Sequence, residues 1–232
     1  MIARFSTLLL GMLLSMQAAA SPMKPFIASY EVVKAGDKIA QTTFSLQPGK
    51  DGTWRYQSRS IPLGWLATAM GISVTETSTL KWHGNDFIVS EYRYERTGKS
   101  KKAHLKFDWD AMKVTNTING DLWKMDVPRG TVDKLSILLA LMTQLKADVK
   151  TYRFSVADGG KLKTYEFNIL GEDSIDTTLG RLKTIKVSRN KLGHKDGRST
   201  LWLAPELNNF IVRVEKKDKN GELIVLKINT LK

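Results

Sequence analysis

The chain has 232 residues, of which 42% are hydrophobic and 25% are charged, the balance of an ordinary globular protein. It has no cysteine, which excludes a disulfide framework, a thiolate nucleophile and a cysteine metal site. The formal net charge of +13 favours anionic partners, although general solubility explains such a charge equally well.

The N-terminal segment has the organisation of a secretory signal peptide. Arg4 supplies the positive start, residues 8–16 the apolar run and Ala18–Ala20 the small residues that a signal peptidase requires. We expect cleavage after Ala20. The apolar run is too short to span a bilayer, and no other stretch approaches transmembrane length, so no transmembrane segment is expected in the mature chain. No cysteine follows the run, so the sequence predicts a periplasmic protein that is not a lipoprotein.

Most of the first half consists of short segments in which apolar and polar residues alternate, the pattern of strands with one wet face. Turn signals separate them, such as PGKDG at 48–52 and the tight-hairpin pair Asn119-Gly120. In chain order, the expected strands lie at 26–34, 38–46, 54–58, 72–82, 87–96, 103–109, 112–118 and 121–127.

One apolar stretch, 61–71, interrupts this alternation. It is bounded by Pro62 and Gly71 and carries no charge, which indicates a short helix or a hydrophobic loop. In a sandwich it would cap the end of the core. In an open barrel it would be a lid whose Trp65 and Met70 touch an apolar ligand.

The sequence predicts one long helix, at 133–150. Its leucines and methionine recur at steps of three and four, and Asp133 is suited to cap its start. Either this helix packs as core against a sheet, or it fills the mouth of a curved sheet and lines a ligand cavity. The candidate cavity residues of the two apolar segments are Leu63, Trp65, Leu66, Met70, Leu135, Leu138 and Met142.

Alternation resumes after the helix, at 152–156, 165–169, 175–189, 200–204, 210–214 and 224–228. A dozen or more strands joined by short turns predict a mainly β fold, with one long and one short helix. We expect a large curved antiparallel sheet that forms a barrel, a half-barrel or a two-layer arrangement. No linker or repeat divides the chain, so residues 21–232 are expected to form a single domain.

The sequence gives no catalytic or metal-binding signature. His83, His104 and His194 lie far apart, and no nucleophile elbow surrounds Ser136, whose expected role is capping. No cofactor is expected. The densest charge cluster is either a solvated set of strand-end residues or a surface for anionic partners, and its members are Arg181, Lys183, Lys186, Arg189 and Lys191.

Several motifs of the second half resemble a known family. They are the helix start DKLS at 133–136, Tyr152-x-Phe154-x-Val156-x-Asp158-Gly159, Tyr165-x-Phe167, Thr177-x-x-Gly180-x-x-x-Thr184-x-x-Val187 and LWLA at 201–204. Together these resemble the exported bacterial family known as domain of unknown function 3108. The resemblance implies a β-rich periplasmic protein of no established activity, and it transfers no functional residues. A looser architectural likeness is to the envelope lipoprotein carriers and their sensor relatives, in which helices cover a curved sheet around an apolar cavity.

These observations favour a non-enzymatic binding or carrier protein for a lipid or an acylated envelope component. The alternative is a scaffold or interaction protein in envelope assembly that binds a protein or an anionic polysaccharide. Anionic glycolipid is a further partner class, whereas an exported protein rarely meets nucleic acid. A hydrolase ranks last, because nothing in the sequence points to the paired carboxylates that it would need.

Overall fold

The computed structural model describes residues 23–65, 69–98, 101–146, 148–192 and 198–232. The expected signal peptide and Leu66 lie outside these ranges, and the side chains of Lys101 and Lys191 are not described. Within the described ranges, no helix is long and apolar enough to cross a membrane.

Fifteen strands form one sheet, which confirms the predicted mainly β fold. The first eight are β1 (Phe26–Lys34), β2 (Asp37–Pro48), β3 (Trp54–Pro62), β4 (Val74–His83), β5 (Asp86–Arg96), β6 (Lys101–Asp108), β7 (Lys113–Ile118) and β8 (Asp121–Asp126). The others are β9 (Val132–Asp133), β10 (Thr151–Asp158), β11 (Lys161–Thr177), β12 (Gly180–Lys191), β13 (Ser199–Ala204), β14 (Phe210–Lys217) and β15 (Leu223–Leu231). All neighbours pair antiparallel except the two-residue β9, which runs parallel to β10.

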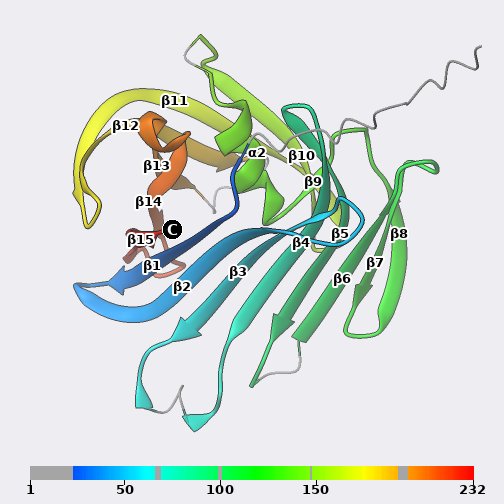
Figure 1. Ribbon diagram of the computed structural model, residues 1–232. Coiled ribbons are helices and arrows are strands. Elements are labelled where there is room, and N and C mark those ends of the chain that lie inside the picture. The colour runs from blue at the N-terminus through cyan, green and yellow to red at the C-terminus, as the bar shows by residue number, and fades with distance from the viewer. Residues whose placement is uncertain (1–22, 66–68, 99–100, 147, 193–197) are drawn as a thin grey trace, which may run out of the picture.

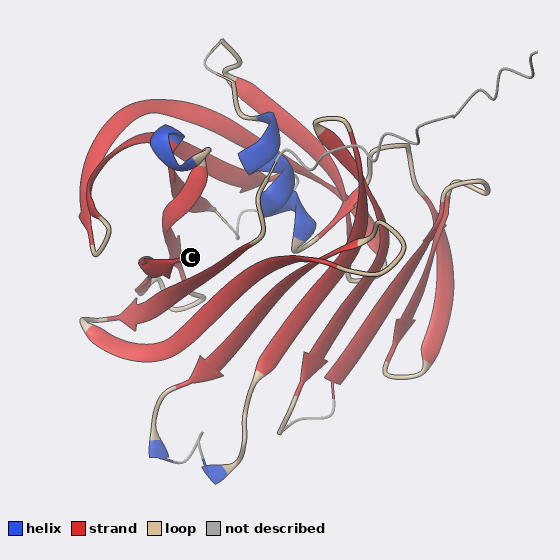
Figure 2. Cartoon of the chain, viewed as in Figure 1, coloured by secondary structure: helices blue, strands red, loops and turns tan. Residues whose placement is uncertain are grey.

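The sheet is open and strongly curved. Its strand order runs from β8 back to β1, continues to β15 and ends at β9, so β1 and β15 join the two halves at the centre. The two halves of the sheet curve towards each other, and the helix α2 (Ser136–Gln144) lies between them on the concave side (Figure 1). Strands make up nearly all of the surrounding wall (Figure 2).

The inner face of the sheet carries the core because side chains alternate between the two faces of a strand. Leu46 and Tyr56 are directly opposite each other on β2 and β3, and both are buried. Ser78 is opposite Tyr56 on β4 and is buried as well. The buried polar side chains on this face therefore need partners inside the protein.

The helix is shorter than the predicted span of 133–150, because its last carbonyl groups are satisfied by side chains from elsewhere. The amide of Asn209 donates to the carbonyl oxygens of Met142 and Leu145, at 3.3 Å each. Leu145 is already extended, and the hydroxyl of Tyr152 accepts from the backbone N–H of Lys146 at 2.7 Å. The chain therefore leaves the helical conformation after Gln144.

The segment 175–189, in which a strand ending in Ile185 and Val187 is expected, is divided between the end of β11 and β12, with a turn between Thr177 and Gly180. The expected strand corresponds to β12. Gly180 has a φ of +105°, a conformation that L-residues with side chains rarely adopt. Alternation alone could not place this hairpin, because its turn carries only a single glycine.

The two ends of the sheet meet through a side chain. Trp123 of β8 donates a hydrogen bond from Nε1 to the carbonyl oxygen of Gly160, in the turn between β10 and β11, at 3.2 Å. A Cβ atom at Gly160 would lie 2.2 Å from the indole ring of Trp123. Strands β8 and β9 do not pair with each other in the described sheet. This contact closes the curve without a backbone ladder.

Candidate functional site

A cavity of about 280 Å³ lies between α2 and the inner face of the sheet. Its volume is just below the range of about 300–1,000 Å³ that is usual for small-molecule sites. Strands from both halves of the sheet contribute to its wall, as does the segment that leads from β9 into α2. It is the place where the two halves of the chain and the helix converge.

One part of the cavity wall is apolar. Leu201, Val214 and Leu226 lie directly opposite one another on β13, β14 and β15, and all three line the cavity. Leu138 and Met142 face them from α2. Leu138 is only half-buried although its neighbours along the helix are fully buried, so part of its surface is available inside the cavity.

Three cationic side chains also line the cavity, namely Lys134, Arg189 and Lys216. Arg189 is on β12 and Lys216 on β14, each two residues along its strand from an apolar inward-facing residue. Lys134 precedes α2 and forms an ion pair with Glu76 of β4 at 3.4 Å. The cavity therefore combines an apolar wall with an excess of positive charge.

Burial lowers the pKa values of two of these cations, and for Lys216 neighbouring positive charges add to the effect. Burial lowers the pKa of Arg189, whose guanidinium lies 5.7 Å from the ring centroid of Tyr165. The pKa of Lys216 is lowered chiefly by desolvation and also by the charges of Arg189 and Lys134. Much of the surface of Lys216 is accessible even so, because the cavity that it lines is open to solvent.

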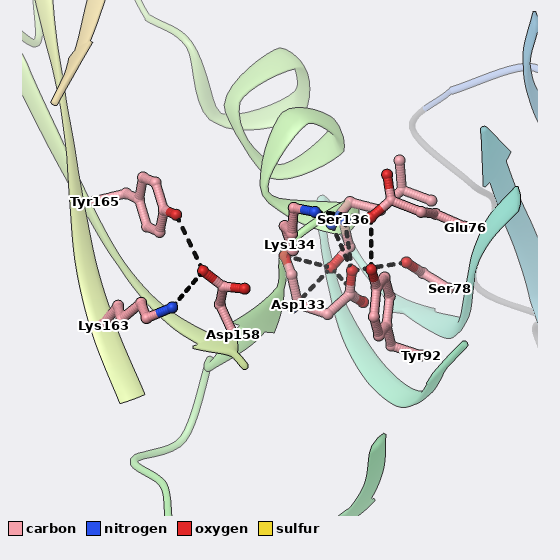
Figure 3. Close-up of polar contacts among 10 residues, drawn as sticks. Glu76, Ser78, Tyr92, Asp133, Lys134, Ser136, Asp158, Lys163 and Tyr165 are labelled. Carbon is pink, nitrogen blue, oxygen red and sulfur yellow. Dashed lines mark hydrogen bonds and ion pairs between the residues drawn. The ribbon is translucent and has the colours of Figure 1, made fainter. Parts of the chain in front are cut away.

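The carboxylate of Asp133 lies beside the cavity and fastens the helix to the sheet (Figure 3). Its Oδ1 accepts from the backbone N–H groups of Leu135 (2.7 Å) and Ser136 (2.9 Å) and from the hydroxyl of Ser78 (2.8 Å). The hydroxyl of Ser136 donates to Oδ2 at 2.8 Å. Burial raises the pKa of Asp133 to about 6, and these hydrogen bonds offset part of that rise.

This arrangement is structural and not nucleophilic. Asp133, Ser136 and Ser78 each have no exposed surface, so a substrate cannot reach the serine hydroxyls. The adjacent Glu76 accepts a hydrogen bond from the hydroxyl of Tyr92 at 2.5 Å. Desolvation, followed by the charge of Glu76, raises the pKa of Tyr92, which keeps this tyrosine protonated.

A second carboxylate, Asp158, lies on the opposite side of the helix start (Figure 3). It forms an ion pair with Lys163 at 2.6 Å and accepts from the hydroxyl of Tyr165 at 3.3 Å. Its charge is therefore largely matched by a partner on β11.

The cavity contains some of the candidate residues from the two apolar segments and not others. Leu135, Leu138 and Met142 line it. Leu63, Trp65 and Met70 are instead 48%, 83% and 55% exposed, in the loop between β3 and β4 at the rim of the sheet and away from α2 (Figure 1). Because α2 occupies the concave side, this loop does not contribute to the described cavity lining, and Leu66 lies outside the described residues.

The predicted basic cluster is divided between different environments. Arg189 lines the cavity, whereas Arg181 and Lys183 are exposed. The ammonium of Lys186 lies 5.1 Å from the ring centroid of Trp202, and the side chain of Lys191 is outside the described part of the chain. The four described side chains of the cluster therefore do not share one environment.

Sequence reasoning missed Lys134, Lys216 and Glu76 as cavity residues. For Lys216 a signal was present, since Val214 and Lys216 occupy alternate positions of one strand and therefore share a face. Val187 and Arg189 likewise occupy alternate positions of one strand and share a face. A cation at an inward position of a strand was thus a better guide than the density of charge along the sequence.

Among the described residues, no group of three or more histidines, aspartates and glutamates could hold a metal ion. Nε2 of His104 instead lies 2.5 Å from Oε1 of Glu91, on the neighbouring strand. A second hollow of about 740 Å³ beside Asn209 is larger but more open, and charged side chains such as Glu172, Lys183 and Glu206 line it. The less open, mostly apolar cavity between α2 and the sheet, with a few convergent polar groups, is the better ligand site.

Comparison with known families assigns the chain. The family described as "Protein of unknown function (DUF3108)" matches residues 26–229. This chain belongs to the DUF3108 family. The resemblance inferred from the sequence motifs is thereby confirmed. A search of the curated proteins finds no match to this DUF3108 protein.

Two solved structures can be compared with this fold. A β-barrel-like protein of the DUF1849 family from Brucella abortus is 10% identical, with a TM-score of 0.56 over 89% of this chain and 96% of that one. The hypothetical lipoprotein YmcC from Escherichia coli K12 is 8% identical, with a TM-score of 0.31 over 92% of this chain and 87% of that one. The first of these likenesses supports the fold of the DUF3108 protein, a curved barrel-like sheet.

Proposed function

We propose that this DUF3108 protein is a non-enzymatic binding or carrier protein of the periplasm whose cavity takes an acyl chain. The observation that carries the proposal is the apolar wall of the cavity, where the half-buried Leu138 faces Leu201 and Val214. An accessible leucine inside a hollow has apolar surface for a ligand to cover. The signal-peptide pattern of the first twenty residues supports the assignment to the periplasm.

The size of the cavity restricts the ligand. A volume of about 280 Å³ suits one acyl chain better than a lipid with several. Each methylene moved from water to an apolar wall contributes about 0.8 kcal/mol, or about fourfold in affinity. We therefore expect affinity to rise about fourfold per added carbon and then to level off once the cavity is full.

Titration calorimetry with neutral 1-monoacylglycerols of increasing chain length, below their micellar concentrations, tests this proposal. Leu138→Trp should fill the cavity and weaken binding at least tenfold. The matched control is Leu170→Trp, since Leu170 is an exposed leucine of β11 that does not line the cavity. Equal binding by the two variants, or an affinity independent of chain length, would refute the acyl-chain role.

The alternative is an envelope scaffold that binds a protein or an anionic polysaccharide. A scaffold needs only a filled core, so the open cavity between α2 and the sheet supports the binding role over it. The same titration separates the two, because a scaffold would give no chain-length dependence.

A further inference from the structure

In one row across three strands of the inner face, a serine has a cationic residue on each side. Arg189 of β12 is opposite Ser199 of β13, which is opposite Lys216 of β14. Side chains directly opposite each other on neighbouring strands point to the same face. The row therefore presents the guanidinium of Arg189 and the ammonium of Lys216 to the cavity, with the buried Ser199 between them.

The row has no carboxylate partner of its own among the described residues. Arg189 Nε and Ser199 Oγ are buried and form no hydrogen bond there, and the guanidinium of Arg189 lies over the ring face of Tyr165. Neither Arg189 nor Lys216 has a carboxylate within ion-pair distance in the described part of the chain. The acids whose charges act on them are already paired, Asp158 with Lys163 and Glu76 with Lys134.

Such a row is costly to the folded protein, because removing a cation from water costs hydration free energy. Desolvation is the chief cause of the lowered pKa of Arg189 and of Lys216. The charges of Arg189 and Lys134 lower the pKa of Lys216 further, although Lys216 keeps much accessible surface. An anion bound between the two cations would supply the counter-charge that neither has within ion-pair distance.

We propose that Arg189 and Lys216, on the two strands that flank Ser199, form the head-group subsite of the acyl-binding cavity and select an amphiphile with an anionic oxygen head, a carboxylate or a phosphate. This inference rests on the proposed function and names the class of ligand. The planar guanidinium of Arg189 suits both head groups, because it can donate two parallel hydrogen bonds to a pair of oxygens.

The position of the row relative to the apolar wall fits one continuous ligand. Val214 and Lys216 are two residues apart on β14, as are Leu201 and Ser199 on β13, so the polar row lies about 7 Å along the strands from the apolar row. A head group at the polar row places the first carbons of its chain against Leu201 and Val214. Leu138 covers the chain from the helix side.

The experiment compares ligands with one chain and different heads. Decanoic acid, decyl phosphate, 1-monodecanoylglycerol and decyltrimethylammonium are titrated separately into the full protein by calorimetry, with inorganic phosphate as the head alone. We expect the better of the two anionic ligands to bind at least tenfold more tightly than the glycerol ester, and the cationic ligand to bind most weakly. The acid and the phosphate arms identify which anionic head is preferred.

Two variants each remove one positive charge from the proposed subsite, and two control variants each remove one positive charge from the exposed surface. Arg189→Gln and Lys216→Met should each weaken the anionic ligand on the order of tenfold and leave the glycerol ester unchanged. Arg181→Gln and Lys183→Met should alter neither, since both residues are exposed on β12 and outside the cavity. Lys216 has much accessible surface, so its variant remains a valid test if Arg189→Gln does not fold.

The outcomes separate this inference from the proposed function. If all four decyl ligands bind equally and affinity still rises with chain length, the head-group subsite is overturned and the acyl-binding role stands. If inorganic phosphate alone matches decyl phosphate, the anion site stands and the acyl-binding role fails. An equal loss of anion binding in Arg189→Gln and Arg181→Gln would also overturn the subsite, because a general charge effect would then explain it.

Discussion

Asp133 shows how one buried carboxylate can make stability depend on pH. Burial raises its pKa in the folded protein to about 6, whereas an exposed aspartate titrates near 3.9. The folded state therefore holds its proton more tightly than the unfolded state. The stabilising contribution is fully present below about pH 4 and is lost as the pH rises through 6.

We expect Asp133→Asn to remove this dependence. The asparagine amide can still accept from the N–H groups of Leu135 and Ser136, and it carries no charge at any pH. The free energy of unfolding of the wild type should fall relative to that of the variant between pH 4 and 6, by up to about 3 kcal/mol. Urea unfolding followed by circular dichroism at several pH values measures the difference.

The exposed Asp110 provides the control, because Asp110→Asn makes the same chemical change at the surface. Its stability should follow that of the wild type across this pH range. If wild type and Asp133→Asn instead give parallel curves from pH 4 to 7, the buried carboxylate does not titrate in this range and the argument fails.

The local part of the Asp133 arrangement was predictable from sequence, and the distant part was not. Asp133 and Ser136 are three residues apart at a helix start, the spacing of a capping interaction. Ser78 is on β4, and only the curvature of the sheet brings its hydroxyl to the same carboxylate. No pattern along the chain relates those two positions.

Among the elements, the helix α2 carries two adjacent leucines with different roles, one in the core and one at the cavity. Leu139 has no exposed surface and packs in the core, whereas Leu138 is half-buried at the cavity. Leu139→Ala should lower the free energy of unfolding by about 2–5 kcal/mol, since it deletes packed methyl groups and leaves a void. Leu138→Ala should cost less than about 1.5 kcal/mol, because its side chain already borders open space.

Urea unfolding of both variants measures this contrast. Each makes the same change in sequence one residue apart, so helix propensity affects both equally. Equal losses of stability would mean that Leu138 is part of the packed core, and the apolar wall of the cavity would lose its main element.

The apolar spacing predicted α2 well, but it could not locate the end of the helix. Leu145 continues the periodic pattern, yet it is extended, because Asn209 occupies the carbonyl oxygens there. That asparagine follows the 3-10 turn η1 (Pro205–Leu207), far along the sequence. Helix ends that are capped by remote side chains leave no local signal.

For the whole molecule, the sequence predicted most of the strands but not how the sheet closes. Short turns imply that successive strands are neighbours, which accounts for the meander. No short turn connects β1 with β15, so this pairing could not be predicted in that way. The curvature of the sheet around the cavity depends on this pairing. Arg189 was therefore predicted only as part of a basic surface cluster, and Lys216 was not singled out at all, because only the folded sheet places them on one face.

The contact between Trp123 and Gly160 gives a test of the closure. Gly160→Ala places a methyl group inside the indole ring and keeps a φ of +73°, so we expect a loss of about 2–3 kcal/mol. Gly159→Ala is the control, because its φ is +62° and its nearest neighbour is Lys163 Nζ at an ordinary 3.6 Å. It should cost only about 1 kcal/mol.

Chemical denaturation of these variants, alone and combined with Trp123→Ala, completes the test. Removing the indole should relieve most of the extra cost of Gly160→Ala and none of that of Gly159→Ala. If the losses in unfolding free energy are additive in both double variants, Trp123 and the turn at Gly160 do not contact each other and the closure is refuted.

The central pairing of β1 with β15 also has a kinetic consequence. The partner of the first strand is the last strand in the described sequence, so the longest loop of the molecule has to close before the middle of the sheet is complete. Contacts of such high sequence separation slow folding. The two halves can form their hairpins early, but the cavity between them exists only after the final strand has docked, which makes that docking the step at which the protein acquires its binding site.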